Sequence, residues 1–169
     1  MSIRERFDLK GKVAVITGSS KGIGKSIARG LAENGAKVVI SSRKQSAVDA
    51  VAEEFKKVGL EAIGIACHIG ETDQCEKLIT KVQEQFGRLD ILVNNAAINP
   101  YYGPLEGSDS AVFDKIMHVN VKAPWLLSNL ALPLMKVQES GSIINIASVE
   151  GLHPGFGLGL YSMTKAALI

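Results

Sequence analysis

Two polar side chains near residue 160 have the types and the spacing for acid–base chemistry. Tyr161 and Lys165 lie four residues apart, so on a helix both project from one face. A free tyrosine has a pKa of about 10, too high for ready proton exchange at neutral pH. A neighbouring ammonium favours the phenolate. The spacing therefore predicts that Tyr161 donates and accepts a proton, assisted by Lys165.

Two further polar residues could belong to the same site. Ser148 ends the apolar run IINIAS, and Asn120 lies in the segment HVNV. A serine at the end of a strand can donate a hydrogen bond to a substrate oxygen as charge develops on it, and losing such a contact costs on the order of 100-fold in rate. Taken singly, Ser148 is more often a strand-end cap, Asn120 a helix hydrogen-bonder and Tyr161 a residue at the edge of the core. The catalytic interpretation depends on the set.

A glycine-rich turn lies near the beginning of the chain, in VAVITGSSKGIGKSIARGLAENGAKVVISSR. The segment predicts a strand, a turn and a helix, the context of a dinucleotide-binding turn. Glycines at 18, 22 and 24 let the backbone approach a pyrophosphate, while the amides and dipole of the following helix attract the anion. The alternative is a turn that binds nothing.

The end of the second predicted strand indicates which dinucleotide would bind. An enzyme that prefers NAD usually has an acidic residue there for the ribose hydroxyls. This chain has Ser42, Arg43 and Lys44 instead, with Lys21 inside the glycine turn. No carboxylate would repel a 2′-phosphate, and Arg43 offers it a fork of donors. We expect NADP(H), unless these residues are ordinary solvated cations.

The elements that must position these residues follow from hydrophobic periodicity. Short β-branched runs predict strands at Val13–Thr17, Lys37–Ser41, Ala62–Cys67, Ile91–Asn94 and Ser142–Ala147. Apolar residues three and four apart predict intervening helices at Ile23–Asn34, Gln45–Val58 and Thr72–Phe86, each followed by a glycine. Asp109–Met135 is a longer, strongly apolar helical stretch that contains Pro124 and Pro133. This alternation predicts an α/β fold, a doubly wound parallel sheet of Rossmann-like type.

Composition narrows the class of protein further. The 169 residues are 46% hydrophobic and show no change of composition, so we expect a single dinucleotide-binding domain over residues 1–169. The net charge of +2 comes from dispersed residues and predicts no nucleic-acid partner. Residues 1–10 lack the apolar stretch of a signal peptide, and no run is apolar enough to span a membrane. Cys67 and Cys75 have neither disulfide nor metal-site spacing, which favours reduced thiols, no metal and a cytoplasmic location.

Taken in order, the motifs resemble those of the short-chain dehydrogenase/reductase family. The resemblance rests on T-G-x-x-x-G-I-G, on NNA at 94–96, and on the ordered set Asn120, Ser148, Tyr161 and Lys165. It covers essentially the whole chain. Two positions depart from the family pattern: Ala97 replaces a glycine, and His68 replaces an aspartate that contacts adenine.

The resemblance implies a hydride transfer between NADP(H) and a carbonyl or alcohol substrate. It implies that Lys165 also holds the nicotinamide ribose and that Asn120 anchors a proton-carrying water chain. The cofactor-binding residues expected from the motifs and the resemblance are Gly18, Ser20, Lys21, Gly22, Ile23, Gly24, Ser42, Arg43, His68, Ile69, Asn94, Ala96, Tyr161 and Lys165. His153, Phe156 and Leu158 are expected to line the substrate cleft, which resembles that of reductases of hydrophobic ketones, aldehydes or retinoids.

Further expectations concern completeness, activity and assembly. Family members usually run to about 250 residues, so we expect a C-terminally incomplete fold that lacks the substrate-binding part, an exposed apolar edge at residues 142–147, and little activity from this chain alone. The apolar stretch Asp109–Met135 predicts a homodimer or homotetramer. The alternative to an enzyme is a non-enzymatic nucleotide-binding module of the same fold, although such a module has no need of all four catalytic-type residues.

Overall fold

A computed structural model describes residues 6–169 and places five strands in one parallel sheet, in the order β3-β2-β1-β4-β5. The strands are β1 (Val13–Thr17), β2 (Lys37–Ser42), β3 (Ala62–Ala66), β4 (Ile91–Asn94) and β5 (Ser142–Asn145). Pairing runs in register, with Val15 opposite both Val39 and Leu92. The predicted α/β class is therefore confirmed.

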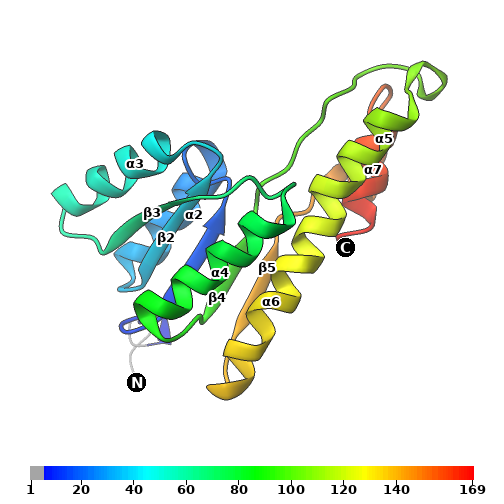
Figure 1. Cartoon of the computed structure of the whole chain (residues 1–169). Helices are drawn as coiled ribbons and strands as arrows, with labels where there is room; N and C mark the ends of the chain where they lie inside the picture. Colours follow the sequence, from blue (N-terminus) through cyan, green and yellow to red (C-terminus); the bar gives the residue numbers. More distant parts are fainter. Residues whose placement is uncertain (1–5) are drawn as a thin grey trace.

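Helices cover both faces of this sheet (Figure 1). The cover of one face is formed by α2 (Gly22–Glu33) and α3 (Gln45–Lys57), and that of the other by α4 (Thr72–Phe86) and α6 (Ala123–Val137). Helices α5 (Ser110–Met117) and α7 (Gly159–Ala166) lie side by side beyond the sheet. Short 3-10 turns lie at Leu105–Gly107 and Val149–Gly151.

The two-sided cover explains why the central strands are continuously apolar. All five residues of β1 are buried, and alternate side chains enter opposite cores. Val13 and Val15 pack with Leu78 of α4, whereas Ala14 and Ile16 pack with Phe55 of α3.

The predicted bounds of β1, β4 and α4 agree with the observed ones, and those of the other sheet strands and of α2 and α3 differ by one or two residues. Helix α2 begins one residue earlier than predicted, and β3 and β5 end one and two residues earlier. The glycines that follow the three helices, Gly35, Gly59 and Gly87, have φ of 96°, 80° and 68°, a left-handed conformation that favours glycine. The prediction that a glycine terminates each of these helices is therefore confirmed.

The long apolar stretch is helical but not uniform. Between α5 and α6, residues His118–Lys122 form a π-helical turn in which the Ala123 amide reaches the His118 carbonyl, five residues back. Pro124 follows at once, and it has no N–H with which to continue the ladder. The interruption centres on Asn120, and π-helical turns occur frequently at functional sites.

Strand β5 forms one edge of the sheet and is the least covered strand. Ser142, Ile144 and Asn145 are exposed, with Ile144 at 43%. Its one well-packed residue is Ile143, which lies against the core under α6. The expected exposed edge is therefore present over residues 142–145, but Ile144 is its one exposed apolar residue.

Candidate active site

The strands end where the predicted site residues lie. In a parallel sheet all carboxyl ends meet at one edge, and ligands bind where the strand order reverses. Here the chain leaves β1 toward β2 on one side, while β4 pairs with β1 on the other. The crevice is therefore expected at the ends of β1 and β4, beside the glycine turn.

Two of the three glycines of the turn are required by close packing. A side-chain carbon at Gly18 would lie 2.9 Å from the Ala96 Cα, and one at Gly24 would lie 2.6 Å from the Gly18 carbonyl oxygen. Neither gap can accommodate a methyl group. The turn is pressed against the residues that follow β4.

The third glycine faces open space instead. Gly22 has φ of 59°, and a carbon built on it meets nothing within 4 Å. Helix α2 begins here without a side-chain cap and without an acidic residue in its first turn. Its free amides and dipole suit an anion at this point. The residues present therefore fit a dinucleotide pyrophosphate.

Side chains that the sequence analysis did not assign hold this turn in place. The Asn95 amide donates to the carbonyls of Thr17 (2.8 Å) and Gly18 (3.2 Å), and the Thr17 hydroxyl accepts from the backbone amides of Asn95 and Ala96. The buried Ser19 hydroxyl donates to Ile16 O and accepts from Ser41 N. Among the predicted turn residues, Ser20 is half-buried and Ile23 is 67% exposed.

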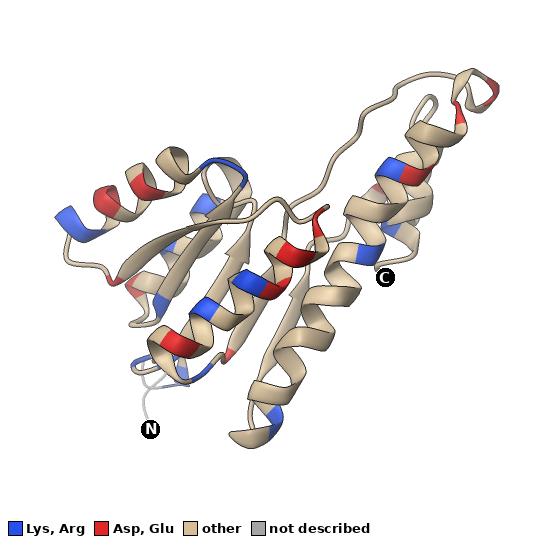
Figure 2. Ribbon diagram, viewed as in Figure 1, with Lys and Arg blue, Asp and Glu red and all other residues tan. Residues whose placement is uncertain are grey.

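The cations expected at the ribose phosphate lie on adjacent segments. Ser19 N donates to Ser41 O, so the turn that carries Lys21 runs beside the end of β2, whose last residue is Ser42 and which Arg43 directly follows. Lys21 and Arg43 are exposed, and neither forms an ion pair with a carboxylate of residues 6–169. The loop that enters α3 is basic (Figure 2). Both cations are thus free to bind a dianion.

The side chains of three other predicted cofactor residues are engaged in contacts within the protein. The His68 ring accepts from the Gly70 amide (3.1 Å), and Ile69 is 8% exposed with its side chain in the core. Asn94 is 3% exposed and donates to Asn145 Oδ1 (2.9 Å), away from the turn. Within the NNA motif, Asn95 and Ala96 are the residues that contact the glycine turn.

Tyr161 and Lys165 lie on α7 as predicted, with the Lys165 ammonium 5.6 Å from the centre of the Tyr161 ring. Lys165 is 3% exposed, and burial lowers the pKa of its ammonium. Its Nζ donates to the Ile146 carbonyl at 2.6 Å, which fastens α7 to the end of β5. That bond places the pair beside Ser148, two residues further along the chain.

Asn120 joins the same network through Thr164. The buried Asn120 amide exchanges two hydrogen bonds with the Ile98 backbone (2.8 and 2.9 Å) and donates to Thr164 Oγ1 (3.1 Å). Thr164 Oγ1 in turn donates to the Tyr161 carbonyl at 2.7 Å. The side chain of Asn120 therefore fixes α7 and the loop after β4; a role in proton transfer stays a prediction.

Ser148 lies at the N-terminal cap of the 3-10 turn Val149–Gly151, where its hydroxyl accepts from the Glu150 amide at 3.2 Å. Because that bond uses an oxygen lone pair, the hydroxyl hydrogen remains free to donate. The turn packs tightly on α7: a side-chain carbon at Gly151 would lie 2.7 Å from the Lys165 carbonyl carbon. The structure thus brings the four predicted catalytic residues into one region.

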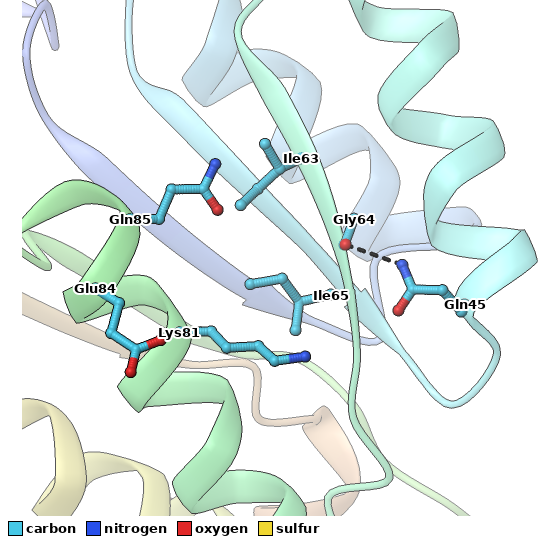
Figure 3. Close-up of a pocket in the computed structure, with 7 residues that line it drawn as sticks. All are labelled: Gln45, Ile63, Gly64, Ile65, Lys81, Glu84 and Gln85. Carbon is cyan, nitrogen blue, oxygen red and sulfur yellow. Dashed lines mark hydrogen bonds between the residues drawn. The ribbon is translucent and has the colours of Figure 1, made fainter.

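A surface hollow lies elsewhere, along the free edge of β3 between α3 and α4 (Figure 3). The Gln45 amide donates to Gly64 O (3.0 Å) and accepts from Ala66 N (2.9 Å), and so replaces a neighbouring strand. The hollow shares no residue with the predicted site, and its best-placed polar group is already paired with the strand. We interpret it as the gap beside an edge strand.

Cys67 and Cys75 are both free and buried. Contact with Cys75 and burial together raise the pKa of Cys67 far above its ordinary value. No cluster of three potential metal ligands occurs within residues 6–169. No helix in that part of the chain is both long and apolar enough to cross a membrane.

Comparison with known proteins identifies the family. The short chain dehydrogenase family matches residues 12–169. The chain belongs to the short-chain dehydrogenase/reductase family of oxidoreductases. It is 42% identical over 167 residues to "Dehydrogenase/reductase SDR family member 4" of Oryctolagus cuniculus, covering 99% of this chain.

Two solved structures of the family share the fold closely. A metagenomic short-chain oxidoreductase in complex with NADP is 40% identical, with a TM-score of 0.91 over 95% of this chain. A gluconate 5-dehydrogenase from Burkholderia cenocepacia, in complex with NADP and tartrate, is 34% identical, with a TM-score of 0.93 over 98%. The chain spans 64% of the rabbit relative and 73% and 65% of these two solved chains.

Proposed function

We propose that this protein is an NADP(H)-dependent oxidoreductase that interconverts a carbonyl and an alcohol. The observation that carries the proposal is the connected set on α7 and β5: Lys165 beside Tyr161 and bonded to the end of β5, two residues before Ser148. A module that only binds a nucleotide does not need this arrangement.

The cofactor would be held by the glycine turn and the basic loop. The open side of Gly22 and the uncapped start of α2 would take the pyrophosphate, and Lys21 and Arg43 the 2′-phosphate. Both solved relatives described above were determined with NADP, which supports the choice. When bound, the nicotinamide supplies or accepts the hydride.

The protein's own residues would handle the proton. The Ser148 hydroxyl hydrogen would bind the substrate oxygen, and the Tyr161 phenol would donate its proton to that oxygen during reduction and recover it during oxidation. The hydrogen bond from Lys165 to Ile146 O holds the ammonium near the Tyr161 ring.

The substrate would lie between two loops that follow β4 and β5. Gly103 N donates to Gly157 O at 3.0 Å, which joins the loops. They expose Tyr102 (71%), Leu152 (64%) and Phe156 (84%). Such a surface suits a hydrophobic ketone or aldehyde.

Homo-oligomerisation through α5 and α6, and a cytoplasmic location consistent with reduced thiols, belong to the same proposal.

A substitution at Ser148 tests the reaction. In the whole protein assayed with NADPH and a panel of aromatic ketones, aldehydes and dicarbonyls, Ser148→Ala is expected to lower kcat about 100-fold and to leave NADPH binding unchanged. Ser142→Ala, at an exposed serine at the start of β5, is the control. Failure of the wild-type protein to oxidise NADPH with any of these carbonyls would refute the proposal.

A further inference from the structure

Glu150 makes three contacts around the site that neither the sequence motifs nor the proposed chemistry uses. Its backbone amide donates to the Ser148 hydroxyl at 3.2 Å. Its carboxylate Oε2 accepts from the Gly155 amide at 2.8 Å and from the Ser162 hydroxyl at 3.2 Å. One residue thus connects the Ser148 turn, the loop of residues 152–158 and the first turn of α7.

The start of α7 lacks the local contacts that usually stabilise a helix end. Helix α7 has no side-chain cap at Leu158 and no acidic residue in its first turn. The Glu150 carboxylate, from a different segment, therefore supplies a side-chain contact to this first turn through the Ser162 hydroxyl. Ser162, whose hydroxyl donates to the Glu150 carboxylate, is 3% exposed and directly follows Tyr161.

The loop of residues 152–158 has few other anchors. Leu152, His153 and Phe156 are exposed, and Gly157 has φ of 75°. Apart from bonds to its immediate neighbours along the chain, the loop is tied at Gly155 by Glu150 and at Gly157 by Gly103. Without the Glu150 carboxylate, the hydrogen bond from Gly103 would be the remaining contact that holds the part of the loop containing Phe156.

We propose that Glu150 is a positioning residue, which holds the 152–158 loop and the start of α7 against the Ser148 turn and so sets the distance between Ser148, Tyr161 and the substrate wall. This inference rests on the proposed function. A misplacement of about 1 Å at a reacting centre can cost about 100-fold in rate, so the contact matters although Glu150 touches no reacting atom.

The test compares Glu150→Ala, Glu150→Asp and Glu150→Gln in the whole protein. Gln keeps an acceptor oxygen at the same reach, whereas Asp keeps the charge but is one methylene shorter. We expect Ala and Asp to lower kcat at least about tenfold with the KM for NADPH unchanged, and Gln to stay within about threefold of wild type. Glu106→Ala, an exposed glutamate on the neighbouring loop, is the matched control.

Hydrogen exchange of the Gly155 amide gives a readout that does not require turnover. Exchange is expected to be at least about tenfold faster in the Ala and Asp variants and unchanged in Gln. Wild-type kcat in Glu150→Asp, or a lower kcat without faster exchange at Gly155, would overturn the proposal. If the wild-type protein reduces no carbonyl, the proposed function fails. The anchoring role is tested separately: unchanged exchange of the Gly155 amide in Glu150→Ala would overturn it.

Discussion

At the scale of single residues, the cations at the ribose end of the glycine turn carry the cofactor assignment. Arg43 is exposed and unpaired with any carboxylate of the described chain, whereas Lys25 and Arg29 on α2 are bonded to Glu54 and Glu33. A guanidinium that is free in this position can form charge-assisted hydrogen bonds with a phosphate.

Arg43→Ala is expected to weaken NADPH binding about tenfold while NADH binding stays nearly unchanged, because one charge-assisted contact to the 2′-phosphate is lost. Fluorescence titration with both cofactors measures the effect, and Arg29→Ala serves as the arginine control. An equal loss for NADPH and NADH would contradict the assignment.

Residue types with a strong chemical signature could be predicted from the sequence, whereas their supports could not. Tyr161, Lys165 and the turn glycines were identified by type and spacing. The supporting roles of Thr17, Asn95 and Thr164 were not predicted. Their contacts join residues 44 to 79 positions apart in the sequence, or depend on one hydroxyl that has two partners. Thr17 and Asn95 do belong to the T-G-x-x-x-G-I-G and NNA motifs, and Thr164 directly precedes Lys165, but nothing in the sequence indicates which groups these side chains contact.

At the scale of elements, the amino ends of β1 and β4 are joined by a buried carboxylate. Asp90 is 3% exposed and accepts from the Val13 amide, Lys12 and Arg88 at 2.6 to 3.1 Å. Burial alone raises the pKa of Asp90, but the bonds from Arg88, Val13 and Lys12 outweigh it and hold the pKa below its ordinary value.

Asp90→Asn should therefore lower the free energy of unfolding by about 1–3 kcal/mol at pH 7. Because the folded-state pKa is lowered, the contribution is fully present above the ordinary value of about 4 and is lost as pH falls toward the folded value. Urea unfolding at several pH values should show the two proteins converging on acidification. A difference that stays constant or widens below about pH 4 would contradict this account.

Hydrophobic periodicity predicted every strand and the helices between them, because a parallel sheet covered on both faces leaves a strong apolar signal. It did not predict the π-helical turn at His118–Lys122. That turn depends on backbone bonds around Pro124 and on the long-range contact of Asn120 with Ile98, neither of which alters the apolar period.

At the scale of the whole molecule, α5 and α6 present an apolar outer face. Phe113, Trp125, Leu132 and Val137 are 41%, 62%, 38% and 88% exposed, and α6 carries hardly any charge (Figure 2). Exposed apolar surface of this extent indicates an interface. We predict that the whole protein is a homodimer or homotetramer, and light scattering at micromolar concentration measures this. A monomer would contradict it.

The chain of residues 1–169 alone is expected to show little turnover, even though it carries all four catalytic-type residues. Tyr161 and Lys165 lie on the eight-residue helix Gly159–Ala166, and helices this short depend on packing partners for their stability. Turnover and NADPH binding should be compared for this chain and the whole protein. Rates within about tenfold of each other, or about 1.4 kcal/mol in barrier, would contradict the prediction.

The central claim is that Tyr161 transfers the proton in an NADPH-dependent carbonyl reduction. The most direct measurement is kcat for NADPH oxidation by wild type and Tyr161→Phe, with NADPH affinity measured separately. Phenylalanine keeps the ring and removes only the hydroxyl, so we predict a fall in kcat of about 100- to 10,000-fold with cofactor binding unchanged. A Tyr161→Phe protein with kcat within about threefold of wild type would show that the proton comes from another group.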